Sequence, residues 1–91
     1  MQFEWDEAKA QANLQKHGVD FKIALKVFVD TDRKTYSDDR FEYGEERYVT
    51  YGHIDDRLYA VVYTEDILNK TIRLISARKA NKREKKKHGY H

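Results

Sequence analysis

"RYVTYGHIDDRLYAVVYT" (residues 47–64) is two stretches rich in β-branched and aromatic residues, separated by Asp55-Asp56. Such residues favour strands, and two residues is the length of a tight turn between antiparallel strands. A third stretch of this kind, "KTIRLIS" (70–76), follows "EDILN" (65–69), which we expect to form a looser turn. These stretches predict the middle of an antiparallel sheet.

The N-terminal part reads as a short strand followed by two helices. "QFEW" (2–5) alternates as an edge strand does. Asp6 stands at the N-cap position of "EAKAQANLQKH" (7–17), and Gly18 follows at the position where helices end in a left-handed residue. A second helix is predicted after Asp20, with an apolar stripe of Phe21, Ala24, Leu25 and Phe28.

The remaining segments complete a predicted order of β-α-α-β-β-β-β-α. "RKTYS" (33–37) is a strand candidate, and "DDRFEYGEE" (38–46) an acidic loop. Ser76 is expected to cap a last helix, "ARKANKREKKKH" (77–88). The sequence thus predicts an α+β fold with an antiparallel sheet, as one domain over residues 1–91, of which about 85–91 form a flexible basic tail.

Composition excludes several classes of protein. The 91 residues contain no cysteine, which rules out a disulfide framework, a thiolate metal site and a cysteine nucleophile. We find neither the apolar core of a signal peptide nor an apolar run approaching a membrane span. We therefore expect a cytoplasmic protein with no membrane partner.

The charge is divided unevenly along the chain. Residues 69–91 hold nine Lys and Arg against one acid, a net charge of +8, whereas residues 1–68 hold nine against fifteen, a net charge of −6. This asymmetry points to a polyanionic partner, most often nucleic acid. The alternative is a solvated terminal helix that binds nothing.

The motifs of metal, cofactor and triad chemistry are missing. The four histidines lack metal-site spacing, the four glycines form no phosphate loop, and there is no nucleophile elbow. We therefore expect no metal and no cofactor. The remaining Arg, Lys, His, Tyr and Glu suit metal-independent RNA cleavage, in which a ribose 2′-hydroxyl attacks its own phosphate.

Two arginines are candidates for binding that phosphate. Arg73 alternates with Ile72 and Leu74 and so projects from the opposite face of the predicted strand. Arg78 is expected in the first turn of the last helix, where both guanidinium groups could meet one phosphate. Alternatively, each arginine forms a surface ion pair with the acidic loop.

For each of the other candidate site residues, a structural role is an alternative to the functional one. His17 could transfer protons or only satisfy the carbonyls at a helix end. Glu84 could accept a proton or pair with Lys87 one helical turn away. Trp5 and the strand tyrosines could stack on bases or belong to the core; these tyrosines are Tyr48, Tyr51, Tyr59 and Tyr63.

Two long segments resemble the BrnT-type toxins. "FEWDEAKAQANLQKHGVDF" is similar to the N-terminal signature of that family, W-D-x-x-K-x-x-x-N-x-x-K-H-G-V-x-F, and the second half, "GEERYVTYG", "VVYT" and "IRLISARKANKRE", resembles it too. The signature positions are filled by Trp5, Asp6, Lys9, Asn13, Lys16, His17, Gly18, Val19 and Phe21. The final "KKKHGYH" departs from the family pattern, so the status of "HGYH" as native sequence is open.

The resemblance implies a fold similar to RelE-like ribonucleases and a toxin that cleaves RNA and arrests translation and growth. It implies a BrnA-like antitoxin with a ribbon-helix-helix part, and binding to operator DNA only through the complex of the two. The cleft would be surrounded by Arg47, Arg73, Arg78 and Glu84, with Lys16 and His17 nearby. We expect RNA contacts from Lys16, Lys79, Lys82, Arg83 and Trp5.

Two other functions compete with the ribonuclease. The chain could be a nucleic-acid-binding module whose basic helix follows phosphates without cleaving, with strongly salt-dependent binding. It could instead serve chiefly as an assembly subunit of an autorepressing toxin–antitoxin complex.

Overall fold

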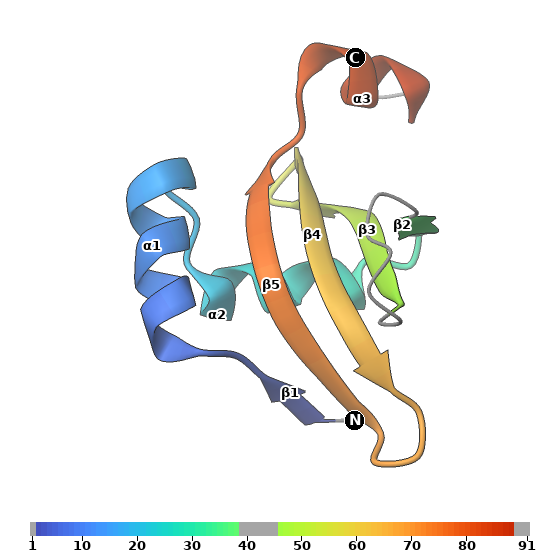
Figure 1. Cartoon of the computed structure of the whole chain (residues 1–91). Helices are drawn as coiled ribbons and strands as arrows, with labels where there is room; N and C mark the ends of the chain where they lie inside the picture. The colour runs from blue at the N-terminus through green and yellow to red at the C-terminus, as the bar shows by residue number, and fades with distance from the viewer. Residues whose placement is uncertain (1, 39–45, 89–91) are drawn as a thin grey trace.

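A five-stranded sheet forms the centre of the protein (Figure 1). The computed structural model describes residues 2–38 and 46–88, and in it the strand order is β1-β5-β4-β3-β2. The strands are β1 (Gln2–Glu4), β2 (Lys34–Asp38), β3 (Arg47–Ile54), β4 (Arg57–Asp66) and β5 (Thr71–Lys79). The predicted α+β class is confirmed. The antiparallel prediction is wrong at one edge, because β1 runs parallel to β5. No hairpin joins these two strands, so nothing local imposes opposite directions.

The predicted helical segments occur, with one change of geometry. Helix α1 (Glu7–His17) begins at Asp6, whose side chain accepts hydrogen bonds from the backbone of Ala8 and Lys9, and ends at Gly18 with φ 70°. The second segment divides into α2 (Phe21–Ala24) and a 3₁₀ helix, η1 (Leu25–Val29). No helix within residues 2–38 or 46–88 is both long and apolar enough to cross a membrane.

The turns follow the sequence closely. Asp55 and Asp56 have φ of 50° and 67°, the left-handed pair that matches the twist of a two-residue hairpin. Strand β4 continues to Asp66, so the looser turn is shorter than expected. Of the predicted acidic loop, residues 39–45 lie outside the described part of the chain.

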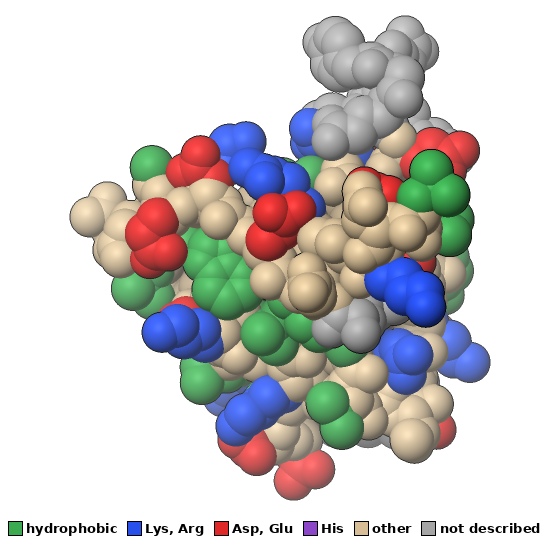
Figure 2. All heavy atoms as spheres, turned by 90° about the horizontal axis from the view of Figure 1, so that it is seen from below, with side chains coloured by type: hydrophobic (Ala, Val, Ile, Leu, Met, Phe, Trp, Pro, Cys, Tyr) green, Lys and Arg blue, Asp and Glu red, His purple; other side chains and the backbone are tan. Residues whose placement is uncertain are grey.

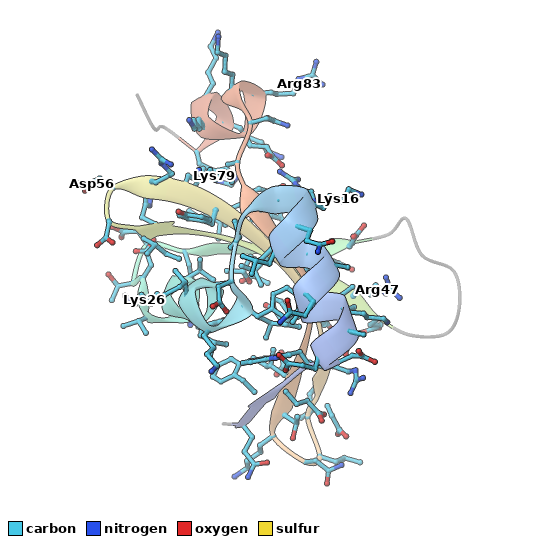
Figure 3. The ribbon with its side chains drawn as sticks, turned by 90° about the vertical axis from the view of Figure 1, so that its left-hand side faces the viewer. Lys16, Lys26, Arg47, Asp56, Lys79 and Arg83 are labelled. Atoms are coloured by element: carbon cyan, nitrogen blue, oxygen red, sulfur yellow. The ribbon has the colours of Figure 1, made fainter. Side chains whose placement is uncertain are left out.

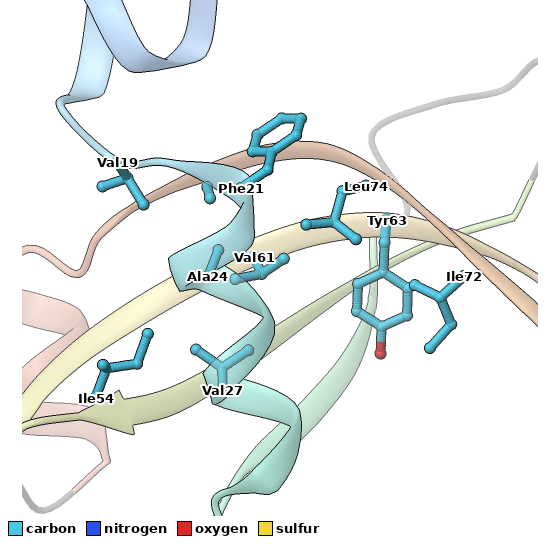
Figure 4. Close-up of a cluster of buried hydrophobic side chains, with 10 residues drawn as sticks. Val19, Phe21, Ala24, Val27, Ile54, Val61, Tyr63, Ile72 and Leu74 are labelled. Atoms are coloured by element: carbon cyan, nitrogen blue, oxygen red, sulfur yellow. The ribbon is translucent and has the colours of Figure 1, made fainter. Parts of the chain in front are cut away.

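The main core lies between the sheet and the segment formed by α2 and η1. Figure 4 shows apolar side chains from both layers meeting there, among them Phe21, Val27, Val61 and Leu74, all almost fully buried. The two layers approach closely at Gly52 of β3, where an added Cβ would lie 2.9 Å from the Cβ of Val27. A side chain at this position would therefore push η1 off the sheet.

A β-bulge interrupts the pairing of β4 with β5. Val62 pairs with Ser76, but the next residue of β4, Tyr63, pairs with Leu74, so Ile75 is an extra residue in β5. The bulge shifts the alternation by one position. Consequently Leu74 and Ala77, three residues apart, both contribute to the same core cluster.

The buried amide of Asn13 joins α1 to the outer edge of β5. Strand β1 covers that edge only as far as Arg73. Further along, the Asn13 Oδ1 accepts from the Ala77 N–H at 3.0 Å, and its Nδ2 donates to the carbonyls of Ala77 at 2.9 Å and Val19 at 3.0 Å. The side chain thus substitutes for a neighbouring strand and also fixes the α1–α2 connection.

The C-terminal helix differs from the prediction. Ser76 does not cap it, because the pairing with β4 continues to Lys79 and keeps Ser76 inside the strand. Helix α3 (Lys82–Lys87) instead begins at Asn81, which forms a reciprocal capping box with Glu84. Lys85–Lys87, expected in a tail, form its last turn, and residues 89–91 lie outside the described chain.

The Asn13→Ala variant should be less stable than the wild type by about 2–4 kcal/mol, because it leaves three buried backbone groups without partners. Urea denaturation followed by circular dichroism measures this change. Asn13→Asp, which has the same shape but no amide donor, should also be destabilised, whereas exposed Gln15→Ala on the same helix should not. An Asn13→Ala midpoint equal to that of Gln15→Ala would show that the edge contact adds no stability.

Candidate functional site

Three arginines lie on one face of the sheet, and the bulge at Ile75 is the reason that Arg73 and Arg78 share it. Arg47 and Arg73 are both aligned with Thr64 of β4, and Arg78 is aligned with Ala60. Thr64 and Ala60 alternate with the core residues of β4 and therefore lie on the side opposite η1. Figure 3 shows Arg47 on the far side of the sheet from Lys26 of η1. We call this side the arginine face.

Positions on the arginine face form rows across the strands. Arg47, Thr64 and Arg73 make one row, and Tyr51, Ala60 and Arg78 make another. The rows are four residues apart along β4, which corresponds to about 13 Å. This distance between the rows allows each row to contact a different charged group of an extended polyanion.

Glu84 of α3 holds Arg78 and Tyr51 together. The Arg78 guanidinium donates to both carboxylate oxygens of Glu84, at 2.8 and 2.9 Å. The Tyr51 hydroxyl donates to Oε2 at 2.7 Å, and the Asn81 N–H donates to Oε1 at 2.9 Å.

Two predictions about this cluster are wrong. Arg78 lies in β5 rather than in a helical turn, and the partner of Glu84 is Arg78 rather than Lys87, because the six-residue offset lets the helix fold back over the strand.

This cluster perturbs the ionisation of its members. The Arg78 hydrogen bonds lower the pKa of Glu84 to about 2 against the opposing effect of burial. Burial, followed by the contact with Glu84, raises the pKa of Tyr51 to about 12. The Glu84 contact also raises the pKa of Arg78. At neutral pH the cluster is therefore a carboxylate, a guanidinium and a protonated phenol.

Aromatic rings adjoin the cluster on its β2 side. The His88 ring lies 4.5 Å from that of Tyr51 at an interplanar angle of 32°, and 5.8 Å from that of Tyr36. Burial and then the Lys87 charge lower the pKa of His88, which favours the neutral imidazole. The predicted flexible tail, residues 85–91, includes His88. Its position four residues after Glu84, on the same side of α3, was the signal that could have placed it here.

The other predicted residues lie around the arginine face or away from it. Lys16 and His17 line a hollow at the outer edge of β5, against Ile75 and Ser76. Arg73 is about half exposed, 3.7 Å from Glu4, which is a solvent-screened contact. Lys79, Lys82 and Arg83 are exposed on β5 and α3; Figure 3 shows Lys79 and Arg83 at the same end of the molecule as Lys16.

Trp5 belongs to the core side. Its ring contacts Phe21 edge to face with centroids 5.9 Å apart, and it packs against the main cluster.

The lower end of the molecule, seen in Figure 2, shows Lys and Arg interspersed with Asp and Glu around apolar side chains. No three His, Asp or Glu side chains of the described residues are grouped so that they could hold a metal ion.

The chain matches the model of a known protein family over most of its length. The model of the family described as ribonuclease toxin, BrnT, of type II toxin–antitoxin systems matches residues 5–84. The matched segment holds Asn13, the three arginines and Glu84, and it ends before His88. A search of curated proteins finds no match.

Low pH should destabilise the folded protein, because it protonates the Glu84 carboxylate. Above pH 4.5, its ordinary pKa, the carboxylate is ionised in both folded and unfolded chains, and its contacts stabilise the fold. As the pH falls toward about 2, the folded carboxyl is protonated and this contribution is lost. Glu84→Gln should therefore be less stable than the wild type by about 1–2 kcal/mol at neutral pH, and the gap should narrow between pH 4.5 and 2. Urea titrations at several pH values measure it, with exposed Glu65→Gln as control; a gap independent of pH would contradict the assignment.

Proposed function

The chain belongs to the BrnT family of ribonuclease toxins of type II toxin–antitoxin systems, and from this premise we propose that it is a metal-independent endoribonuclease. In the proposed reaction the ribose 2′-hydroxyl loses its proton and attacks the adjacent phosphorus. The bond from phosphorus to the 5′-oxygen breaks, and that oxygen takes up a proton. RNA cleavage of this kind inhibits translation and growth.

The placement of Arg47, Arg73 and Arg78 on one face carries this proposal. The reaction passes through a phosphorane with extra negative charge on its oxygens, and a planar guanidinium matches two such oxygens at once. Arg73 projects from the middle of β5 into solvent, while Arg78 is fixed in direction by Glu84. We assign phosphate binding and charge stabilisation to these side chains.

Glu84 and Tyr51 act as positioning residues in this scheme. A general base works best with a pKa near the operating pH, and the Glu84 pKa of about 2 makes it a weak one. Its two oxygens already accept four hydrogen bonds, which is the capacity of a carboxylate. Tyr51, with a pKa of about 12, remains protonated.

The proton transfers then fall to imidazoles. His17 lies beside Ser76, which is on the arginine face, and His88 lies over Tyr51 on the other side of Arg78. One can take the proton of the 2′-hydroxyl, and the other can donate to the leaving 5′-oxygen. Lys16, Lys82 and Arg83 extend the positive surface and would contact neighbouring phosphates. Lys79 is aligned with Tyr59 and therefore points to the core side of the sheet, so it has no part in this scheme. Trp5 has no part in this scheme.

The antitoxin is the second partner in the proposal. We propose a BrnA-like protein with a ribbon-helix-helix part, which covers the arginine face with an acidic or apolar segment and carries the pair to operator DNA. Occupying the cationic surface would exclude RNA by competition. We further propose a topology of the RelE type and a cytoplasmic location, where both RNA and antitoxin are found.

Replacing one exposed arginine tests the assignment. Arg73→Ala should lower RNA cleavage at least about hundredfold without affecting stability, since oxyanion-stabilising donors contribute on that scale. Arg57→Ala, at the start of β4 on the core side of the sheet, is the matched control. Induced expression with growth curves and total-RNA gels, then purified protein with labelled RNA in EDTA, measures both. Arg78→Ala is less informative alone, because it also releases α3.

Two results would overturn the ribonuclease assignment. Folded wild type that leaves RNA intact but binds it with strong salt dependence is a non-catalytic binding module. A chain that neither binds nor cuts RNA, yet recovers operator binding when co-expressed with its partner, is an assembly subunit. Cleavage that disappears in EDTA and returns with a divalent ion would contradict metal independence.

Substituting each imidazole separately tests the proton transfers. We expect His17→Gln and His88→Gln each to reduce the cleavage rate about hundredfold or more, and His88→Gln also to remove one limb of the bell-shaped pH–rate profile. Single-turnover cleavage of a short RNA between pH 5 and 9 measures the profile. A variant that keeps the wild-type rate across this pH range excludes that histidine from the chemistry.

A further inference from the structure

Tyr36 lies on the arginine face, at the outermost strand of the sheet. It is paired with Val49 of β3, whose neighbours two residues away on the same face are Arg47 and Tyr51. Tyr36 is thus a diagonal neighbour of both, at the distance across which aromatic and long side chains still interact. Its ring meets that of Tyr51 edge to face, with centroids 5.9 Å apart.

Tyr36 is an exposed aromatic residue that does not belong to the core. Tyr36 is 39% exposed, and it is the only aromatic among the exposed large hydrophobic residues of the described chain. The others are aliphatic and lie on α1, α2, η1 and the β4–β5 turn, outside the arginine face. Tyr36 therefore offers an aromatic surface where the proposed RNA substrate would lie.

The surroundings of Tyr36 suit a flat, uncharged ring attached to a phosphate. The Lys87 Nζ stands over the Tyr36 ring, 5.0 Å from its centre, so a stacked base would displace this exposed side chain toward the phosphate. Lys34 lies two residues from Tyr36 on the same strand face. The contact of His88 with Tyr51, in which the ring planes are tilted by 32°, shows that a planar heteroaromatic ring already packs in this part of the face. A nucleobase is such a ring, and its backbone would meet the lysines and Arg47.

We propose that Tyr36 is a base-stacking residue, which binds a nucleobase of the RNA strand whose phosphate lies at the arginines. This inference rests on the proposed function. Stacking on aromatic side chains tolerates any base, so the contact adds affinity and sets the register of the strand more than it selects sequence. It also places the strand across β2 and β3, toward the end of α3.

The test measures binding separately from cleavage. The probe is a short single-stranded RNA with 2′-O-methyl riboses, in which the attacking hydroxyl is blocked, and affinity is followed by fluorescence anisotropy. Tyr36→Leu should weaken binding about tenfold or more, as loss of one stacked base does. Tyr36→Phe, which keeps the ring, should bind like the wild type. Leu68→Ala, an exposed apolar change in the β4–β5 turn, is the control.

An abasic probe separates stacking from other causes of weak binding. Where the RNA has lost the base that stacks on Tyr36, wild type and Tyr36→Leu should bind it equally. Equal binding of the intact probe by wild type and Tyr36→Leu overturns the inference, as does a loss that persists on every abasic probe. If the wild type binds through Tyr36 but cleaves no RNA, the stacking site stands and the proposed function fails. If cleavage and binding are both unchanged in Tyr36→Leu, the proposed function stands and the stacking site fails.

Discussion

The hydrogen bonds of the Asn13 amide to the Ala77 peptide group are the interaction on which the rest of the structure depends. A β-strand edge inside a protein must satisfy its backbone groups, and β1 is too short to do so beyond Arg73. Asn13 completes the pairing at 2.9 and 3.0 Å while its third hydrogen bond secures Val19 at the start of the second helical segment. One residue thereby fixes α1, the α1–α2 connection and the end of β5 that carries Arg78.

The same end of β5 owes its orientation to the single extra residue Ile75. In a regular strand, residues 73 and 78 point to opposite faces, because five is an odd number of positions. With the bulge, Arg73 and Arg78 share a face, and Leu74 and Ala77 share the core. The charge distribution of the sheet is therefore a consequence of register as much as of composition.

Local signals in the sequence were sufficient for most of the fold. Asp6, Gly18 and the Asp55-Asp56 turn act through neighbouring backbone groups, so their roles are readable from a few residues. The β1–β5 pairing and the bulge depend on segments about seventy and a dozen residues apart, which periodicity does not relate.

The prediction that Ser76 caps the last helix was wrong because a serine followed by charged helix formers resembles an N-cap. The stronger signal is Asn81 with Glu84 three residues later, and it lies five residues further along the chain. The chemistry of a side chain does not indicate its neighbours, so the sequence does not predict that His88 lies against Tyr51 or that Trp5 packs on Phe21.

Helix α3 is six residues long, shorter than any helix that is stable alone in water. Its order is therefore coupled to the contacts that Arg78 and Tyr51 make with Glu84. Thermodynamic reciprocity follows from this coupling. An anion that competes with Glu84 for Arg78 must supply the free energy that the helix loses. An anion that leaves the pair intact meets a surface already ordered. The affinity of the arginine face is thus set partly by the folding equilibrium of a segment that need not contact the anion.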